Sequence, residues 1–263
     1  MKRQFARVFV ASVMASHVAA QSAEPPPILK IVREYMKPGK GAAHEKNEAA
    51  FARAFQNSKF PNYIAWEALS GPTQVWFLEG YANYAGIETA LKISAAEPLK
   101  STLEQLEVED GELRTGESTT IAYYAKDLSY FPVPLNLAKT HFVWVDMVRI
   151  QRGHVEEYAE MRKIQNAAFE KVGAKWQRAV YVIGNGAAAT DYLVVRPMES
   201  LSEMDAPAHW NNREALGESF ERYRKLTSDL IVSADDILFA VNPKMSNPPK
   251  AFLDADPAFW AAK

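Results

Sequence analysis

Apolar and polar residues alternate most clearly over residues 142–150, so that every second side chain of an extended chain lies on the same side. A period of two residues predicts a strand. One face is wholly apolar, and the opposite face carries Trp144 and the charged Asp146. The wholly apolar face consists of Val143, Val145 and Met147.

The segments that follow this strand complete a small sheet unit. Over residues 155–172 apolar side chains recur every three or four residues, which predicts an amphipathic helix. Residues 178–183 and 189–195 then flank Gly184-Asn185-Gly186. Because Asn and Gly tolerate positive φ, this pattern predicts a β-hairpin.

The first half of the chain shows the same order of elements. We expect strands over residues 28–36, 63–69, 73–79 and 119–125, with helices over 42–56 and 99–113. Matching residues of the two halves lie 114 to 118 positions apart, which predicts an internal duplication. Each repeat reads β-α-β-β-α-β, so we expect an α+β protein with two tandem ferredoxin-like repeats.

The N-terminus has the pattern of a secretory signal peptide. Lys2, Arg3 and Arg7 precede a short apolar run that ends in small residues at Ala20. This predicts a periplasmic or secreted protein; an amphipathic N-terminus is the alternative, because polar residues interrupt the run. The expected divisions are a signal peptide over 1–20, a linker over 21–27, a first repeat over 28–129, a linker over 130–139, a second repeat over 140–246 and a tail over 247–263.

Composition and charge exclude several classes of protein. The chain of 263 residues is 48% hydrophobic, which is ample for a sizeable core. Its net charge of −2 becomes more negative if residues 1–20 are removed, so we expect no nucleic-acid partner. No other segment approaches the roughly 20 apolar residues of a membrane span, and no membrane partner is expected after signal cleavage. The absence of cysteine excludes a disulfide framework and a thiolate metal site.

Two short motifs carry a resemblance to a known family. Residues 33–40 (REYMKPGK) lie at the first strand-to-helix turn, and residues 76–81 (WFLEGY) overlap the third expected strand. With two ferredoxin-like units in tandem, they resemble the NIPSNAP-like branch of the dimeric α+β barrel superfamily. The second half departs from this pattern, with residues 150–154 (IQRGH) at the matching turn.

The resemblance implies two sheets that close face to face into a barrel with helices outside, here within one chain. The superfamily includes cofactor-free monooxygenases, haem enzymes such as the chlorite dismutase group, and proteins without a settled activity, so the resemblance does not choose a function.

If the wholly apolar strand faces lie under the helices, the mixed faces look into the barrel. That interpretation places Trp66, Ala68, Val180 and Val182 under helices and leaves Asp191 and Arg196 unassigned. A desolvated carboxylate in the barrel would have a raised pKa and serve as a general base. The candidate catalytic residues are Asp146 and Glu67, and the candidate ligand-binding residues are Lys30, Glu34, Tyr63, Tyr124, Trp144, Tyr181 and His209, with Asn242 beside them. The alternative is that Lys30, Glu34, Glu67 and Asp146 pair with one another to join the two sheets.

The histidines show no metal-binding spacing. His44 and Glu48 are four residues apart on a predicted helix, but a second histidine is missing. We expect surface or capping roles for His44 and His154. His209 precedes the last helix, where a loop could cover the barrel mouth or simply enter the helix. No metal and no cofactor are therefore predicted.

Three functions remain open from the sequence. The first is an exported barrel protein that binds a small, partly apolar molecule, with a cofactor-independent oxygenase activity as its extension. The second is a haem protein of the chlorite dismutase kind, and the third is a non-catalytic interaction protein that uses exposed helices or the aromatic tail. Nothing resembles a P-loop or a serine-hydrolase motif. A homo-oligomer is compatible with each, and the sequence does not decide whether the protein is an enzyme.

Overall fold

The computed structural model describes residues 24–205 and 213–261. The predicted signal peptide over 1–20 and the candidate residue His209 lie outside these ranges. The strands are β1 Ile28–Met36, β2 Tyr63–Ala68, β3 Gln74–Tyr81, β4 Arg114–Tyr124, β5 Phe142–Ile150, β6 Ala179–Asn185, β7 Asp191–Met198 and β8 Ile231–Val241.

These strands form one closed antiparallel barrel in the order β1-β3-β2-β8-β5-β7-β6-β4. The first half contributes the run β4-β1-β3-β2 and the second half the run β8-β5-β7-β6. The pairs β2 with β8 and β4 with β6 join the two halves. The predicted α+β fold, a barrel of the dimeric α+β type closed within one chain, is confirmed.

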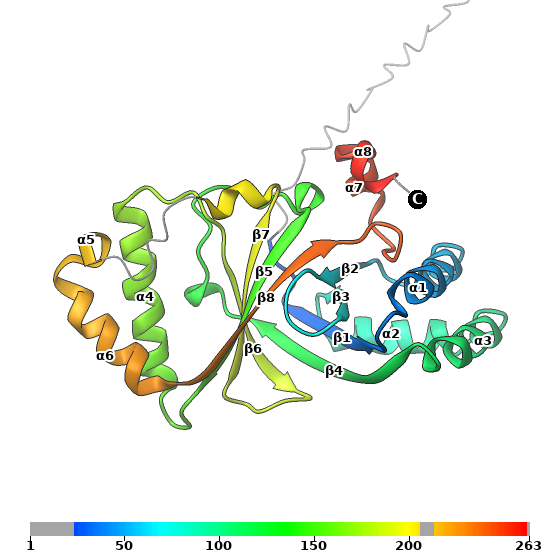
Figure 1. Ribbon diagram of the computed structural model, residues 1–263, viewed down its shortest axis with the longest axis horizontal. Helices are drawn as coiled ribbons and strands as arrows, with labels where there is room; N and C mark the ends of the chain where they lie inside the picture. Colours follow the sequence, from blue (N-terminus) through cyan, green and yellow to red (C-terminus); the bar gives the residue numbers. More distant parts are fainter. Residues whose placement is uncertain (1–23, 206–212, 262–263) are drawn as a thin grey trace, which may run out of the picture.

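The helices lie outside the barrel in two groups, one on each side (Figure 1). The first half carries α1 Gly41–Gln56, α2 Tyr84–Ser94 and α3 Leu99–Gly111, and the second half carries α4 Val155–Lys171, α5 Arg213–Leu216 and α6 Phe220–Leu230. Helix α2 was not predicted, because the expected helices of the first half cover only residues 42–56 and 99–113. Within the described ranges, no helix combines the length and hydropathy needed to cross a membrane.

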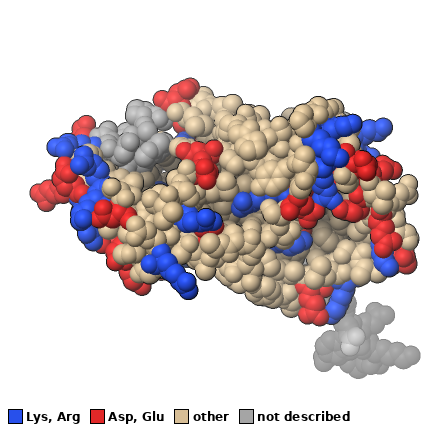
Figure 2. Space-filling model, turned by 60° about the horizontal axis from the view of Figure 1, so that its bottom comes forward, with Lys and Arg blue, Asp and Glu red and all other residues tan. Residues whose placement is uncertain are grey.

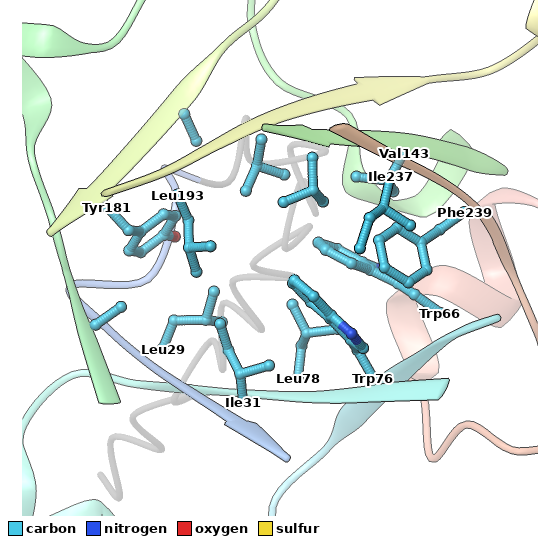
Figure 3. Packing of buried hydrophobic residues seen from close by; sticks show 14 of the residues in the cluster. Leu29, Ile31, Trp66, Trp76, Leu78, Val143, Tyr181, Leu193, Ile237 and Phe239 are labelled. Atoms are coloured by element: carbon cyan, nitrogen blue, oxygen red, sulfur yellow. The ribbon is translucent and has the colours of Figure 1, made fainter. Parts of the chain in front are cut away.

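The barrel interior is lined by apolar side chains from all eight strands (Figure 3). Trp76 and Phe239, whose ring centroids are 4.8 Å apart, lie among them and are fully buried. The predicted facing of the β5 and β2 strands is therefore wrong: Val143, Val145 and Trp66 point into the barrel, with Met147 and Ala68 packed against the same cluster. A closed barrel excludes water from its interior more completely than helices exclude it from the outer face, so the wholly apolar face turns inward.

The mixed strand faces consequently point outward, toward the helices. Trp144 and Asp146 share a cavity with residues of α4 and α6, and Lys30 and Glu34 share one with residues of α1 and α2. Tyr63 packs edge-on against Phe55 of α1, while Glu67 and Asn242 are hydrogen-bonded to each other at 3.0 Å on the same side. The expectation that these residues line the barrel is wrong for the same reason. The facing of Tyr181 and Tyr124 toward the barrel, and of Val180 and Val182 toward the helices, is confirmed.

The C-terminal tail covers one end of the barrel with α7 Lys250–Ala255 and α8 Pro257–Trp260 (Figure 1). Trp260 is 1% exposed, belongs to the barrel core and donates a hydrogen bond of 2.7 Å from Nε1 to the carbonyl oxygen of Ala138. The closed barrel has no free sheet edge, and the tail caps this end of it. An apolar cavity of about 570 Å³ lies at this end, lined by Trp66, Tyr181, Phe252 and Trp260 among others.

Candidate functional site

A cavity of about 300 Å³ lies between the outer face of the second-half sheet and helices α4 and α6. The sheet contributes Trp144 and Asp146 from β5 and Arg196 from β7, which pairs with Trp144 in the ladder. Helix α4 contributes Arg162 and Gln165. We call this cavity the basic pocket, because three of its lining residues, Arg162, Arg178 and Arg196, are buried arginines.

The arginines are held by neutral groups. Arg162 donates from Nε and Nη2 to the hydroxyl of Tyr158, at 2.8 and 2.6 Å, and from Nη1 to Gln165 Oε1 at 3.0 Å. Arg178 donates to the same Gln165 oxygen and to Asn166 Oδ1. Within the described ranges, no carboxylate lies within ion-pair distance of Arg162, Arg178 or Arg196. Buried charges are usually paired, so this pocket has an excess of positive charge that suits an anionic ligand.

Burial changes the protonation of two groups in this pocket. Desolvation, with the neighbouring Arg162 adding to it, lowers the pKa of Arg178 to about 9. Desolvation also raises the pKa of Asp146 to about 6, although Arg162 opposes the shift. Asp146 Oδ1 is buried and makes no hydrogen bond. Asp146 is thus a carboxylate that is largely ionised at neutral pH and still has a free oxygen, as a general base requires.

Aromatic rings form the remaining walls of the basic pocket. The guanidinium of Arg196 stacks over Trp176 at 4.1 Å, and that of Arg178 lies 5.0 Å from the ring centroid of Phe169. Trp144 donates a hydrogen bond to Asp236 at the pocket's margin. Arg178 Nε and Arg196 Nε are buried without a hydrogen-bond partner. Apolar walls with a few converging polar groups are typical of small-molecule sites.

Of the predicted site residues that the structure describes, two, Asp146 and Trp144, meet in this pocket. Tyr124 and Tyr181 lie inside the barrel with ring centroids 5.6 Å apart, and Tyr63 lies in the first half. The predicted mutual pairing of charged residues is wrong. Lys30 pairs with Glu79 at 2.7 Å, Glu34 with His44 and Arg114, and Glu67 with Asn242, while Asp146 has no ion-pair partner among the described residues.

The first half holds a pocket of about 240 Å³ in the corresponding place, between its sheet and helices α1 and α2. At its margin Glu34, His44, Glu48 and Asp110 bring one possible ligand atom each to within 4.8 Å of the others, and all four are buried. We call these residues the His-carboxylate cluster. His44 is 1% exposed, so the expected surface or capping role is wrong. His154, in contrast, is partly exposed at the start of α4 beside Glu157, and a surface role for it is confirmed.

The arginines and the tyrosines of the basic pocket were not predicted from the sequence. Gln165 falls on the apolar stripe of its helix together with Tyr158, and a polar residue on such a stripe indicates a buried hydrogen-bond network. Arg178 directly precedes a strand whose first residues are apolar. Arg196, which could not be assigned to a face, lies on the helix side with Trp144. In the sequence, the basic pocket was indicated by Gln165, Arg178 and Arg196, three polar residues in largely apolar segments.

Comparisons with known proteins support the fold. No family model matches the sequence. No curated protein matches it either. Among solved structures, an anthrone oxidase-like protein superposes with a TM-score of 0.57 at 10% identity, covering 84% of this chain and 93% of its own.

Two further solved structures are similar over most of the chain. A candidate monooxygenase from Fusobacterium nucleatum has a TM-score of 0.53 at 14% identity, covering 83% of this chain and 94% of its own. Another, from Lactobacillus acidophilus NCFM, has a TM-score of 0.51 at 8% identity, covering 82% and 94%. At these identities the likeness concerns the fold, which is that of the dimeric α+β barrel.

Proposed function

We propose that the basic pocket binds a small, partly apolar molecule with an anionic or readily ionised oxygen. The observation that carries this proposal is the set of three buried arginines that line one cavity without a carboxylate ion pair in the described part of the chain. Arg162 and Arg178 provide the positive charge, and Trp176 and Phe169 provide the apolar walls. Arginine suits this role because its planar guanidinium donates several hydrogen bonds to an oxygen anion.

We further propose that the bound molecule is oxidised by molecular oxygen without a cofactor. Asp146 removes a proton from a CH₂ group that is conjugated with a carbonyl, directly or through an aromatic ring, and the arginines stabilise the negative charge on the enolate oxygen that results. Oxygen, the oxidant, accepts the electrons of the carbanion and forms a C–O bond. The hydroperoxide then loses water, so that CH₂ and O₂ become C=O and H₂O. The folds of an anthrone oxidase-like protein and of candidate monooxygenases are compatible with this reaction class.

Binding is tested first with a matched pair of ligands, 2-naphthoate and its neutral amide, by quenching of tryptophan fluorescence. We expect the carboxylate to bind at least about 10-fold more tightly, and Arg178→Gln to remove that preference. Arg222→Gln is the control, because Arg222 is exposed on α6 and pairs with Glu160. Equal affinity for the two ligands would contradict the proposal.

Oxidation is tested separately by oxygen consumption with anthrone. We expect Asp146→Asn to lower the rate at least about 100-fold while the dissociation constant of 2-naphthoate changes less than about threefold. A rate that is unchanged in this variant would exclude Asp146 as the base. A Soret band in the protein as isolated would instead favour the haem alternative.

We also propose a family relation, an internal duplication and an export signal for this chain. The motifs at residues 33–40 and 76–81 support a relation to the NIPSNAP-like branch, and the matching order of elements in the two halves supports an internal duplication. The basic residues and the small-residue cleavage site before residue 21 support export to the periplasm or the medium. The proposed divisions into signal peptide, linkers, repeats and tail are those expected from the sequence. N-terminal sequencing of the mature protein checks this, and a mature chain that still begins at Met1 would contradict it.

The remaining alternative from the sequence is a non-catalytic protein that binds a partner through exposed helices or its aromatic tail, and the packing of the tail disfavours the second of these surfaces. Trp260 is buried in the barrel core and is therefore not presented to a partner.

A further inference from the structure

The His-carboxylate cluster carries more negative charge than its surroundings neutralise. Arg114 binds Glu34 Oε1 at 3.0 Å from Nη1 and Asp110 Oδ2 at 2.8 Å from Nε. It leaves one oxygen of each carboxylate free to face His44, whose Nε2 lies 2.7 Å from Glu34 Oε2 and 3.6 Å from Asp110 Oδ1. With a neutral imidazole, the three carboxylates of the cluster and this one guanidinium leave an excess of two negative charges, and Glu107 and Glu117 share the same guanidinium.

Two buried carboxylates in this cluster have oxygens that lack a partner. Asp110 is 1% exposed, and its Oδ1 makes no hydrogen bond. Glu48 is 6% exposed and makes no hydrogen bond or ion pair within the described ranges. Leaving a carboxylate buried and unpaired is costly, so the arrangement is explained more simply if a cation completes it.

We propose that His44 Nε2 and one oxygen each of Glu34, Glu48 and Asp110 bind a divalent transition-metal ion. Two positive charges balance the excess of the cluster. One nitrogen and three oxygen ligands favour Mn²⁺, Fe²⁺ or Zn²⁺, whereas Mg²⁺ and Ca²⁺ prefer oxygen ligands alone. Arg114 takes the place of the outer hydrogen-bond partner that commonly orients metal-binding carboxylates.

The elements of the fold explain how these ligands meet. Glu34 projects from the outer face of β1, His44 and Glu48 are one helical turn apart on α1, and Asp110 lies at the end of α3. Contacts between α1 and α3 bring Asp110 into place, with Asn47 Nδ2 donating to the carbonyl oxygen of Leu106 at 3.1 Å. Glu34 and Glu48 also line the first-half pocket, so the metal would border a cavity of about 240 Å³ walled by Phe55, Tyr63 and Phe77. A site that borders a cavity can exchange a water molecule for a ligand, as catalytic metal sites do.

The test uses the whole protein after dialysis against EDTA and then against metal-free buffer. We expect one equivalent of Mn²⁺ to bind, measured by loss of the free Mn²⁺ signal in electron paramagnetic resonance, and Zn²⁺ to compete with it. Glu48→Gln and Asp110→Asn should each weaken Mn²⁺ binding at least about 100-fold. Glu45→Gln is the control, because Glu45 lies on the same helix but binds Asn242 and Lys244 instead.

A second measurement separates a metal site from a purely structural network. Nitrogen coupling from the His44 imidazole should appear in the electron spin-echo spectrum of bound Mn²⁺ and disappear in His44→Gln. Glu48→Gln removes an unpaired buried charge, so the metal-free variant should melt at or above the temperature of the metal-free parent and lose only the stabilisation by metal. Mn²⁺ binding that is absent from the parent, or equally strong in Glu48→Gln, would overturn the proposal. Neither result affects the basic pocket, which lies in the other half of the molecule.

Discussion

Arg162 and Arg178 both donate to Oε1 of Gln165, so that two buried guanidinium groups lie beside each other on a single neutral acceptor. Gln165 is itself held by Tyr223, whose hydroxyl accepts a hydrogen bond of 3.2 Å from Nε2. Two like charges in one cavity repel, and the shared amide reduces that cost without neutralising either charge. An anionic ligand would reduce the repulsion between the two guanidinium groups further.

Replacing Gln165 tests this arrangement. We predict that Gln165→Leu lowers the free energy of unfolding by about 2–4 kcal/mol, because both guanidinium groups lose an acceptor while they stay buried. Urea denaturation measures the change, and Lys163→Ala on the exposed side of the same helix should change stability by less than about 0.5 kcal/mol. In the background of Arg178→Met the loss should be smaller, since one of the two stranded charges is gone. An equal loss in both backgrounds would show that the residues are not coupled.

Asp146 makes stability depend on pH. Its pKa is raised to about 6 from the ordinary value of 3.8, so the folded state binds the proton more tightly than the unfolded state. The contribution of this group to stability is therefore greatest below pH 3.8 and is lost as the pH rises to about 6. We predict that Asp146→Asn is more stable than the parent by about 3 kcal/mol above about pH 6, with no gain below about pH 4. A gain that is the same at both pH values, measured by urea denaturation, would contradict the assignment.

Gly186 is fixed both by its backbone conformation and by its surroundings. Its φ is +86°, and an added Cβ would lie 2.1 Å from the backbone oxygen of Thr119 in β4. Gly153 has a φ of +91° with open space around it. We predict that Gly153→Ala costs about 1–2 kcal/mol from backbone strain alone, and that Gly186→Ala costs at least about 2 kcal/mol more. Thermal unfolding of the two variants measures the difference. Equal losses of stability would show that β4 moves to accommodate the added methyl group.

Trp260 ties the tail to the barrel. We predict that Trp260→Ala lowers the free energy of unfolding by about 3–5 kcal/mol, because a fully buried indole and its hydrogen bond to Ala138 are lost. Leu91→Ala is the control, since Leu91 is 60% exposed on α2 and should contribute less than about 0.5 kcal/mol. If Trp260→Ala is equally mild, the tail is not part of the folded core.

The sequence predicts the strands and most helices well, because their hydrophobic periods are strong. The predicted strands over 28–36 and 142–150 coincide with β1 and β5. The hairpin between β6 and β7 is confirmed, but Asn185 does not adopt positive φ, whereas Gly186 does. Asn185 pairs with Ile121 of β4 instead, because the barrel closes there. Turn chemistry identified the hairpin but could not supply this long-range pairing.

The candidate site was only partly predictable for a physical reason. Alternation divides a strand into two faces but does not say which face is better shielded from water. Both faces of these strands are buried, one inside the barrel and the other under helices. Choosing the wrong face placed Trp144 and Asp146 together correctly while assigning them to the wrong cavity. The His-carboxylate cluster depends on the contact of α1 with α3. The spacing of residues in the sequence relates His44 to Glu48, but it does not predict that Glu34 and Asp110 lie beside them.

Figure 2 shows side chains of both charge signs at the two helix-bearing ends of the molecule, so the contrast between the pockets lies beneath this surface. A barrel assembled from two identical chains would carry each substitution twice, once in each half. Here β1 and β5 belong to one chain, and each can change without the other. Glu34 in the His-carboxylate cluster and Asp146 beside the arginines of the basic pocket illustrate that freedom. A single chain can thus hold a positively charged pocket and a negatively charged cluster in one barrel, always in a ratio of one to one.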